Sequence, residues 1–174
     1  MPRRLVPLLL LCALPTLATT LVAMDVAALT RASQCVVRAR VSSVSSQRSP
    51  SGRITTSVEL ERLETWAGLD LPTLRMSVPG GVVGEIGQRV EGAPSFVAGE
   101  EVVLFLAARG TVFQPVGLGQ GVWRVDRVTG TPLVRPEPLD GVLLVGPAAP
   151  DVSALRTPMT LEQLRSQVRA ASSR

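Results

Sequence analysis

Residues 53–66, RITTSVELERLETW, decide the fold class. Two kinds of side chain alternate through Glu61. The apolar or small set is Ile54, Thr56, Val58 and Leu60, and the polar set is Arg53, Thr55, Ser57, Glu59 and Glu61. A period of two places each set on its own face of a β-strand. The stretch therefore predicts an antiparallel strand with one buried and one solvent-facing side.

Strand patterns continue on both sides of this stretch. Before it, CVVRARVSSV (35–44) alternates in its first half, and SPSG (49–52) is a turn signal. After it, TLRMSV (73–78) alternates again, and EVVLFLA (101–107) has no polar face, which predicts a central strand covered on both sides. The remaining strand patterns are TVFQPV (111–116), GVWRVDRV (121–128) and TPLVRP (131–136), with Thr129–Gly130 as a hairpin tip.

Short strands between turn signals predict a mainly β domain over residues 19–145. We expect a small antiparallel barrel or sandwich, OB-like, with a short N-terminal helix and a C-terminal helix.

Local capping signals predict both helices. Asp25 is placed to cap a short helix over Val26–Ala32, because its carboxylate can accept from free amides of the first turn. Residues 146–159 form a proline- and alanine-rich linker. Thr160 and Gln163 then form a capping box for an amphipathic helix over residues 160–171. Its narrow apolar stripe predicts docking on the parent domain, with partner binding as the alternative.

The first residues predict export. Residues 1–18 combine a short basic start, an apolar run and a small-x-small cleavage pattern ending at Ala18, which is typical of a signal peptide. We expect a secreted or periplasmic protein, without a lipid anchor or a membrane span after cleavage. Loss of Arg3 and Arg4 lowers the formal net charge from +4 to +2. The remaining arginines are spread singly along the chain, so no nucleic-acid partner is expected.

Composition closes many routes to catalysis. The chain has no His, Lys or Tyr, which excludes Ser-His-Asp triads, His-ligated zinc, phosphate-loop lysines and Schiff bases. No cofactor and no metal site is expected. Cys35 is the single cysteine after residue 18, and its place on the apolar face of a predicted strand favours burial.

A glycine- and proline-rich segment precedes the central strand. Its turn-forming positions are Pro79, Gly80, Gly81, Gly84, Gly87, Gly92, Pro94 and Gly99. No helix follows the glycines directly, so a phosphate-binding loop is not expected. The pattern predicts a long structured surface loop between two strands, pinned to the core by Phe96, with Gln88 satisfying backbone groups.

Surface loops on β scaffolds often carry function, so this loop is also the first candidate binding surface. Gln88 and Arg89 are its expected polar contacts, and Phe96 belongs to the same candidate binding set. Trp123 beside Arg124 is a second candidate patch, because both residue types are enriched at interaction hot spots.

The segment VPGGVVGEIGQRVEGAPSFVAGEEVVLFL (78–106), followed by PVGLGQGVWRV (115–125), resembles a recurring pattern in small exported bacterial proteins of unknown function. The motif PGGxxGxxGQxVxGxPxFxxGEExVxFL is its most specific part, and the likeness runs from about Leu21 to Val125. In such proteins an ADxVVVGRV-like strand precedes the motif; here LTRASQCVVRARV (29–41) stands there, with Cys35 in place of an acidic or small residue. The resemblance implies no activity and no catalytic residue. The outline is also similar to OB-type barrels, including netrin-like modules, by analogy of fold alone.

Three functions follow as hypotheses. The first is an exported, non-enzymatic module that binds a protein or a cell-envelope component. The second is a protease-associated inhibitor or chaperone-like partner whose loop enters a protease cleft. The third is a carboxylate-based hydrolase using Glu85, Glu91, Glu100 or Glu101. Glu100 and Glu101 are adjacent, so in a strand they point to opposite faces and cannot pair with each other.

Overall fold

The computed structural model describes residues 19–127, 130–147 and 157–173. The predicted signal peptide and most of the predicted linker lie outside these ranges, as does Thr129 of the predicted hairpin tip. The N-terminal elements are β1 (Thr19–Val22), α1 (Val26–Ala32), β2 (Cys35–Arg48), β3 (Ile54–Gly68) and β4 (Thr73–Pro79). The middle elements are β5 (Gly81–Val83), β6 (Ile86–Gln88), β7 (Glu101–Arg109), β8 (Val112–Pro115) and the 3-10 helix η1 (Leu118–Gly121). The C-terminal elements are β9 (Val122–Asp126), β10 (Leu133–Pro136), β11 (Val142–Val145), β12 (Met159–Thr160) and α3 (Leu161–Ser172).

A partly closed ring of strands forms the body of the protein. β2, β3 and β4 pair antiparallel in chain order, and β7 joins the free side of β2. β8 pairs antiparallel with β7 and makes one parallel contact with β4, between Met76 and Phe113, which closes the ring. The mainly β fold predicted from the sequence as a small barrel or sandwich is therefore confirmed, as a barrel-like, partly closed sheet with a parallel contact at its closure.

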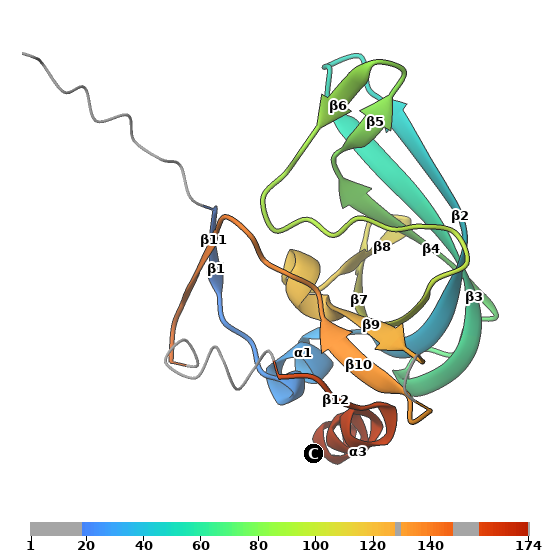
Figure 1. Cartoon of the computed structure of the whole chain (residues 1–174), viewed down its shortest axis with the longest axis vertical. Helices are drawn as coiled ribbons and strands as arrows, with labels where there is room; N and C mark the ends of the chain where they lie inside the picture. Colours follow the sequence, from blue (N-terminus) through green and yellow to red (C-terminus); the bar gives the residue numbers. More distant parts are fainter. Residues whose placement is uncertain (1–18, 128–129, 148–156, 174) are drawn as a thin grey trace, which may run out of the picture.

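The long strands β2 and β3 bend to wrap around the barrel (Figure 1). Their register shifts at three places, between Val36 and Val37, between Arg38 and Ala39, and between Val41 and Ser43. Extra residues of this kind bend a strand and increase its twist. The curvature lets one hairpin contribute to two sides of the barrel.

β7 is buried on both faces, as its unbroken apolar sequence predicts. Val102, Leu104 and Leu106 point into the barrel, where they join Cys35 and other inward residues of the ring in an inner cluster. Val103 and Phe105 point outward into an outer cluster, which contains Leu29 of α1, Trp66, Trp123, and Leu164 and Val168 of α3. One strand therefore joins the two hydrophobic cores of the protein.

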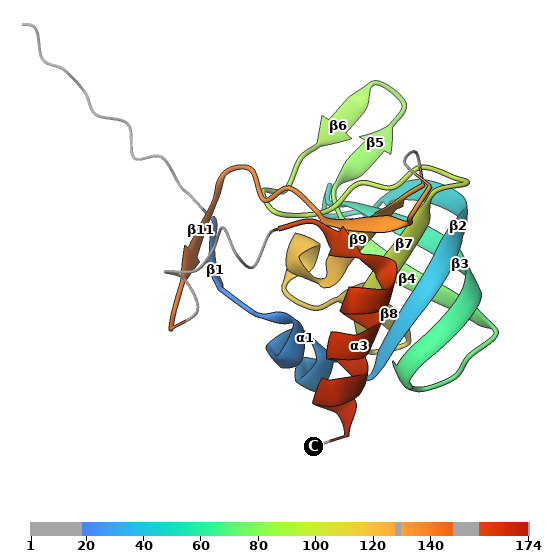
Figure 2. The same cartoon turned by 60° about the horizontal axis from the view of Figure 1, so that its bottom comes forward.

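Both predicted helices cover this outer cluster. Beyond β7 the sheet continues through β9, β10 and β12, and α3 and α1 lie side by side against it (Figure 2). Asp25 Oδ1 accepts from the Ala28 amide at 2.6 Å, and Thr160 and Gln163 form the predicted capping box. Leu164 and Val168 are fully buried, so α3 docks on its own domain. None of the helices described is long and apolar enough to cross a membrane.

Two pairings outside the barrel ring were not predicted. β1 pairs in parallel with β11, and these strands form an arm beside the barrel (Figure 1). Met159 and Thr160 form β12 against β10, although Met159 falls in the predicted linker. Each pairing joins segments far apart in the sequence, so no local pattern specifies it.

Candidate functional site

The glycine-rich segment connects β4 to β7 and contains a small hairpin. β5 and β6 pair with each other, from Gly81 opposite Gln88 to Val83 opposite Ile86, with Gly84 and Glu85 in the turn. The sequence pattern predicted a long structured surface loop between two strands here. Apolar residues flanking a two-residue turn that begins with glycine are a hairpin signal, and Gly84 takes the positive φ of 60° that such turns require. This local signal was present in the sequence.

Polar side chains fasten the base of the hairpin to the β2–β3 end of the barrel. Gln88 Oε1 accepts from the Ile54 amide at 2.6 Å, which confirms its predicted role in satisfying a backbone group. Thr56 Oγ1 donates to the Gly80 carbonyl at 2.7 Å and lies 2.8 Å from Ser46 Oγ. Gly81 has a φ of 131°, and a Cβ there would collide with the hydroxyls of Thr56 and Ser46.

The second half of the segment crosses the mouth of the barrel. Phe96 is buried in the inner cluster, so the predicted pinning of the loop is confirmed. The Gly92 carbonyl accepts from the Gly119 amide at 2.8 Å, and the Gly99 amide donates to the Val41 carbonyl at 2.8 Å. Pro94 is also buried. This half of the segment therefore lies across the barrel mouth and is held by backbone hydrogen bonds near both of its ends.

Arg124 holds this half of the segment to the sheet, an arrangement called the Arg124 clamp below. Its guanidinium pairs with Glu100 and, at 2.6 Å, with Glu137, donates to the Ser95 carbonyl at 2.5 Å, and lies 5.7 Å from the ring centroid of Phe96. Burial acts to lower the pKa of Arg124, but hydrogen bonds and charges from Glu137 and Glu100 outweigh it and raise the pKa. The side chain is a charged structural link between β9, β10 and the glycine-rich segment.

Trp123 points the other way. It is 2 % exposed and lies in the outer cluster, because neighbouring residues of a strand face opposite sides. Trp123 and Arg124 therefore do not share one surface patch in this structure. Contact of either residue with a partner stays a prediction. In the structure Trp123 packs in the outer cluster and Arg124 forms ion pairs with Glu100 and Glu137.

The exposed part of the segment contains three large apolar side chains. Val82 is 66 % exposed, Ile86 47 % and Val97 70 %, while the Arg89 side chain is 73 % exposed and lies 3.4 Å from Glu91. A groove of about 470 Å³ separates the hairpin from the barrel. Its lining includes Val44, Ser46, Val82, Gln88, Pro94 and Phe96. Arg89 was predicted from the sequence, but the three exposed apolar residues were not. They could have been recognised as apolar side chains inside a stretch rich in turn-forming residues.

The candidate carboxylates do not converge. Glu100 pairs with Arg124, Glu101 pairs with Arg38 at 3.3 Å and with Arg127 at 2.7 Å, and Glu85 occupies the hairpin turn. Hydrogen bonding to Glu101 raises the pKa of Arg127. Within the residues described, no group of three or more His, Cys, Asp or Glu side chains is placed to hold a metal ion.

Cys35 is a free, buried thiol, as predicted. Burial raises its pKa to about 11, so the reactive thiolate is strongly disfavoured near neutral pH. Cys35 is therefore a packing residue of the inner cluster.

No protein-family model, curated protein or solved structure matches this chain. Fold and site together define a small, mainly β protein with a barrel-like, partly closed sheet, covered on one side by two helices.

Proposed function

We propose that the chain is an exported, non-enzymatic binding module that contacts a protein partner through the β5–β6 hairpin and its groove. The observation that carries this proposal is a fastened hairpin whose outer side chains, Val82 and Ile86, are apolar and exposed. Val82 lies on the face that lines the groove, and Ile86, paired with Val83, lies on the opposite face. Each face of the hairpin therefore presents an exposed apolar side chain to a partner. Gln88, Thr56 and the Arg124 clamp hold the surface in place before binding, which lowers the ordering cost of association.

The hairpin also offers backbone groups to a partner. Within the described residues β5 and β6 pair only with each other, so each has an outer edge outside any sheet. An extended peptide can add to such an edge through main-chain hydrogen bonds, with side chains read by the neighbouring groove. Arg89 supplies an exposed cationic group beside this edge.

A protease-associated inhibitor is the second candidate, because the same exposed and fastened hairpin has the form of an insertion loop. This alternative predicts loss of activity when a protease is mixed with the protein. The carboxylate hydrolase is third, because Glu91, Glu100 and Glu101 all lie against arginines. Single changes of Glu85, Glu91, Glu100 and Glu101 to Gln test it by hydrolase assay.

The experiment compares residues 19–174 with two double variants in affinity capture from the native envelope and medium. Val82→Ser with Arg89→Ala alters the hairpin, whereas Val22→Ser with Leu143→Ser removes exposed apolar side chains from the β1–β11 arm. Equal melting temperatures establish equal folding. Captured proteins are then purified, and their dissociation constants measured.

We expect a partner that binds the parent and the arm variant equally and the hairpin variant at least about tenfold more weakly. A partner lost only in the arm variant, or no difference among the three proteins, would remove the hairpin from the proposal.

A further inference from the structure

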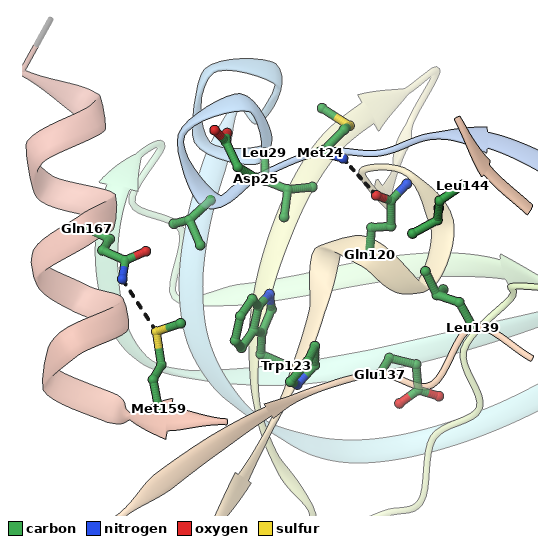
Figure 3. A pocket seen from close by; sticks show the side chains of 12 residues that line it. Met24, Asp25, Leu29, Gln120, Trp123, Glu137, Leu139, Leu144, Met159 and Gln167 are labelled. Atoms are coloured by element: carbon green, nitrogen blue, oxygen red, sulfur yellow. Dashed lines mark hydrogen bonds between the residues drawn. The ribbon is translucent and has the colours of Figure 1, made fainter. Parts of the chain in front are cut away.

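A second concavity lies between α1, α3, η1 and the β1–β11 arm and shares no lining residue with the groove beside the hairpin. Its volume is about 160 Å³, and its walls are mainly apolar (Figure 3). The principal wall residues are Met24, Leu29, Trp123, Leu139, Leu144 and Met159. Met24, Leu139, Leu144 and Met159 are only partly buried, so the pocket opens to solvent.

The polar side chains around this pocket are already engaged, with one exception. Gln120 accepts from the Met24 amide at 2.9 Å and donates to the Val22 carbonyl at 3.0 Å, and Gln167 contacts the sulfur of Met159 at 3.7 Å. Asp25 caps α1, and Glu137 pairs with Arg124.

The exception is the indole N–H of Trp123. This nitrogen is buried and has no hydrogen-bond partner among the described residues. Figure 3 shows the indole among the lining side chains, with its nitrogen edge turned into the space that they enclose. Buried indole donors usually find an acceptor, so the unpartnered N–H beside this pocket is a group whose hydrogen bond a bound acceptor can complete.

We propose that this pocket binds a small, neutral, mostly apolar carbonyl compound whose oxygen accepts the Trp123 hydrogen bond. The apolar walls favour a hydrocarbon body, and the single free donor favours one acceptor oxygen. A cavity of about 150 Å³ accommodates a molecule of benzene size, so the ligand is a short ketone, ester or lactone. Met24 and Met159 are flexible enough to adapt the walls to its shape.

The chain offers a direct readout, because it contains two Trp residues and therefore two indole N–H groups. Trp66 is the internal control, since its Nε1 already donates to Glu64 at 2.8 Å. Both signals are followed by ¹⁵N–¹H NMR on labelled residues 19–174, with Trp66→Phe used only to assign them. The probes are cyclohexanone and its near-isostere methylenecyclohexane, which lacks the acceptor.

Two variants separate pocket binding from general effects. Leu144→Phe fills the pocket from β11, whereas Leu143→Phe adds the same bulk to the neighbouring exposed position. Circular dichroism checks that both are folded.

We expect cyclohexanone to move the Trp123 signal downfield and saturably, with a dissociation constant on the order of 1 mM or below, and to leave Trp66 nearly unmoved. Methylenecyclohexane should bind about 3- to 10-fold more weakly, without the downfield shift, because it cannot accept the hydrogen bond. Leu144→Phe should abolish binding and Leu143→Phe should retain it. An unmoved Trp123 signal, equal affinity for both probes, or unchanged binding by Leu144→Phe would overturn the proposal.

Discussion

Gln88 and Arg124 hold the connection between β4 and β7 from its two ends. Gln88 bonds to the backbone of β3 at the hairpin base, and Arg124 gathers Ser95, Phe96 and Glu100 over the barrel mouth. A surface segment with few regular hydrogen bonds is thereby ordered by side chains. Both residues were candidate binding residues from the sequence, and in the structure both make contacts that hold the segment to the barrel.

Gly81 is a position where the backbone and its surroundings require glycine. We expect Gly81→Ala to lower the free energy of unfolding by about 2–4 kcal/mol, because its φ of 131° disfavours a side chain and a Cβ would overlap Thr56 and Ser46. Gly84→Ala is the matched control, since its φ is 60° and no atom lies within 4 Å, and it should cost about 1 kcal/mol. Urea unfolding of both variants measures the difference. Equal losses would contradict the predicted collision.

Cys35 makes stability depend on pH in the alkaline range. Its pKa is raised from 9.0 to about 11 in the folded protein, so the unfolded chain releases this proton first. The folded state then binds more protons between pH 9 and pH 11, and the free energy of unfolding should fall by on the order of 2 kcal/mol across that window.

No other side chain of residues 19–174 titrates in this window, because the chain lacks Lys and Tyr and arginine remains charged. Urea unfolding from pH 8 to pH 11 tests the effect. Cys35→Ala should remove most of the pH dependence, although it lowers stability at every pH. Parallel curves for the two proteins would show that the thiol is not its source.

In β7 and α3, the number of covered faces matches the pattern of apolar residues in the sequence. β7 is apolar at successive positions because both of its faces are covered, whereas α3 buries only one narrow stripe. The capping box begins α3 directly after β12, so the helix starts where the sheet ends. The element is thereby positioned by both a local signal and a long-range pairing.

Leu164 measures how much α3 contributes to the fold. We expect Leu164→Ala to lower the free energy of unfolding by about 2–4 kcal/mol, because a fully buried side chain is removed from the outer cluster. Ser166→Ala, at an exposed position of the same helix, should change it by less than about 0.5 kcal/mol. Chemical denaturation gives both values. A small effect at Leu164 would instead favour the partner-binding alternative for this helix.

In the molecule as a whole, the two hydrophobic clusters are joined through β7. Since the strand supplies side chains to both, neither cluster can lose its packing without exposing β7. We expect residues 19–174 to unfold in one cooperative transition.

The chain carries natural probes for each cluster. Cys35 reports on the inner one through its reaction with a thiol reagent, and Trp66 and Trp123 report on the outer one through fluorescence. Midpoints in urea should coincide. Separate midpoints would mean that the helical side opens while the barrel remains closed.

The features predicted correctly from the sequence depend on interactions between residues close together in the chain. The period-two pattern at Ile54–Leu60 specifies a face without specifying a neighbour, and the caps at Asp25 and Thr160 lie within one helical turn of their partners. The roles of Gln88 and Phe96 were also predictable. In a turn-rich segment a side-chain amide commonly bonds to backbone groups, and an aromatic ring is commonly buried. The hairpin at Gly84 was readable but was predicted as a loop.

Composition and local pattern alone specify the mainly β class, the capped helices, the buried face of Cys35 and the exclusion of histidine and lysine chemistry. These properties depend on composition or on contacts within a few residues. Three features arise only in the folded chain: the Met76–Phe113 closure, the β1–β11 arm and the pocket at the indole. Each requires segments distant in the chain to meet, and which of them pair is set by packing of the whole core and by loop closure.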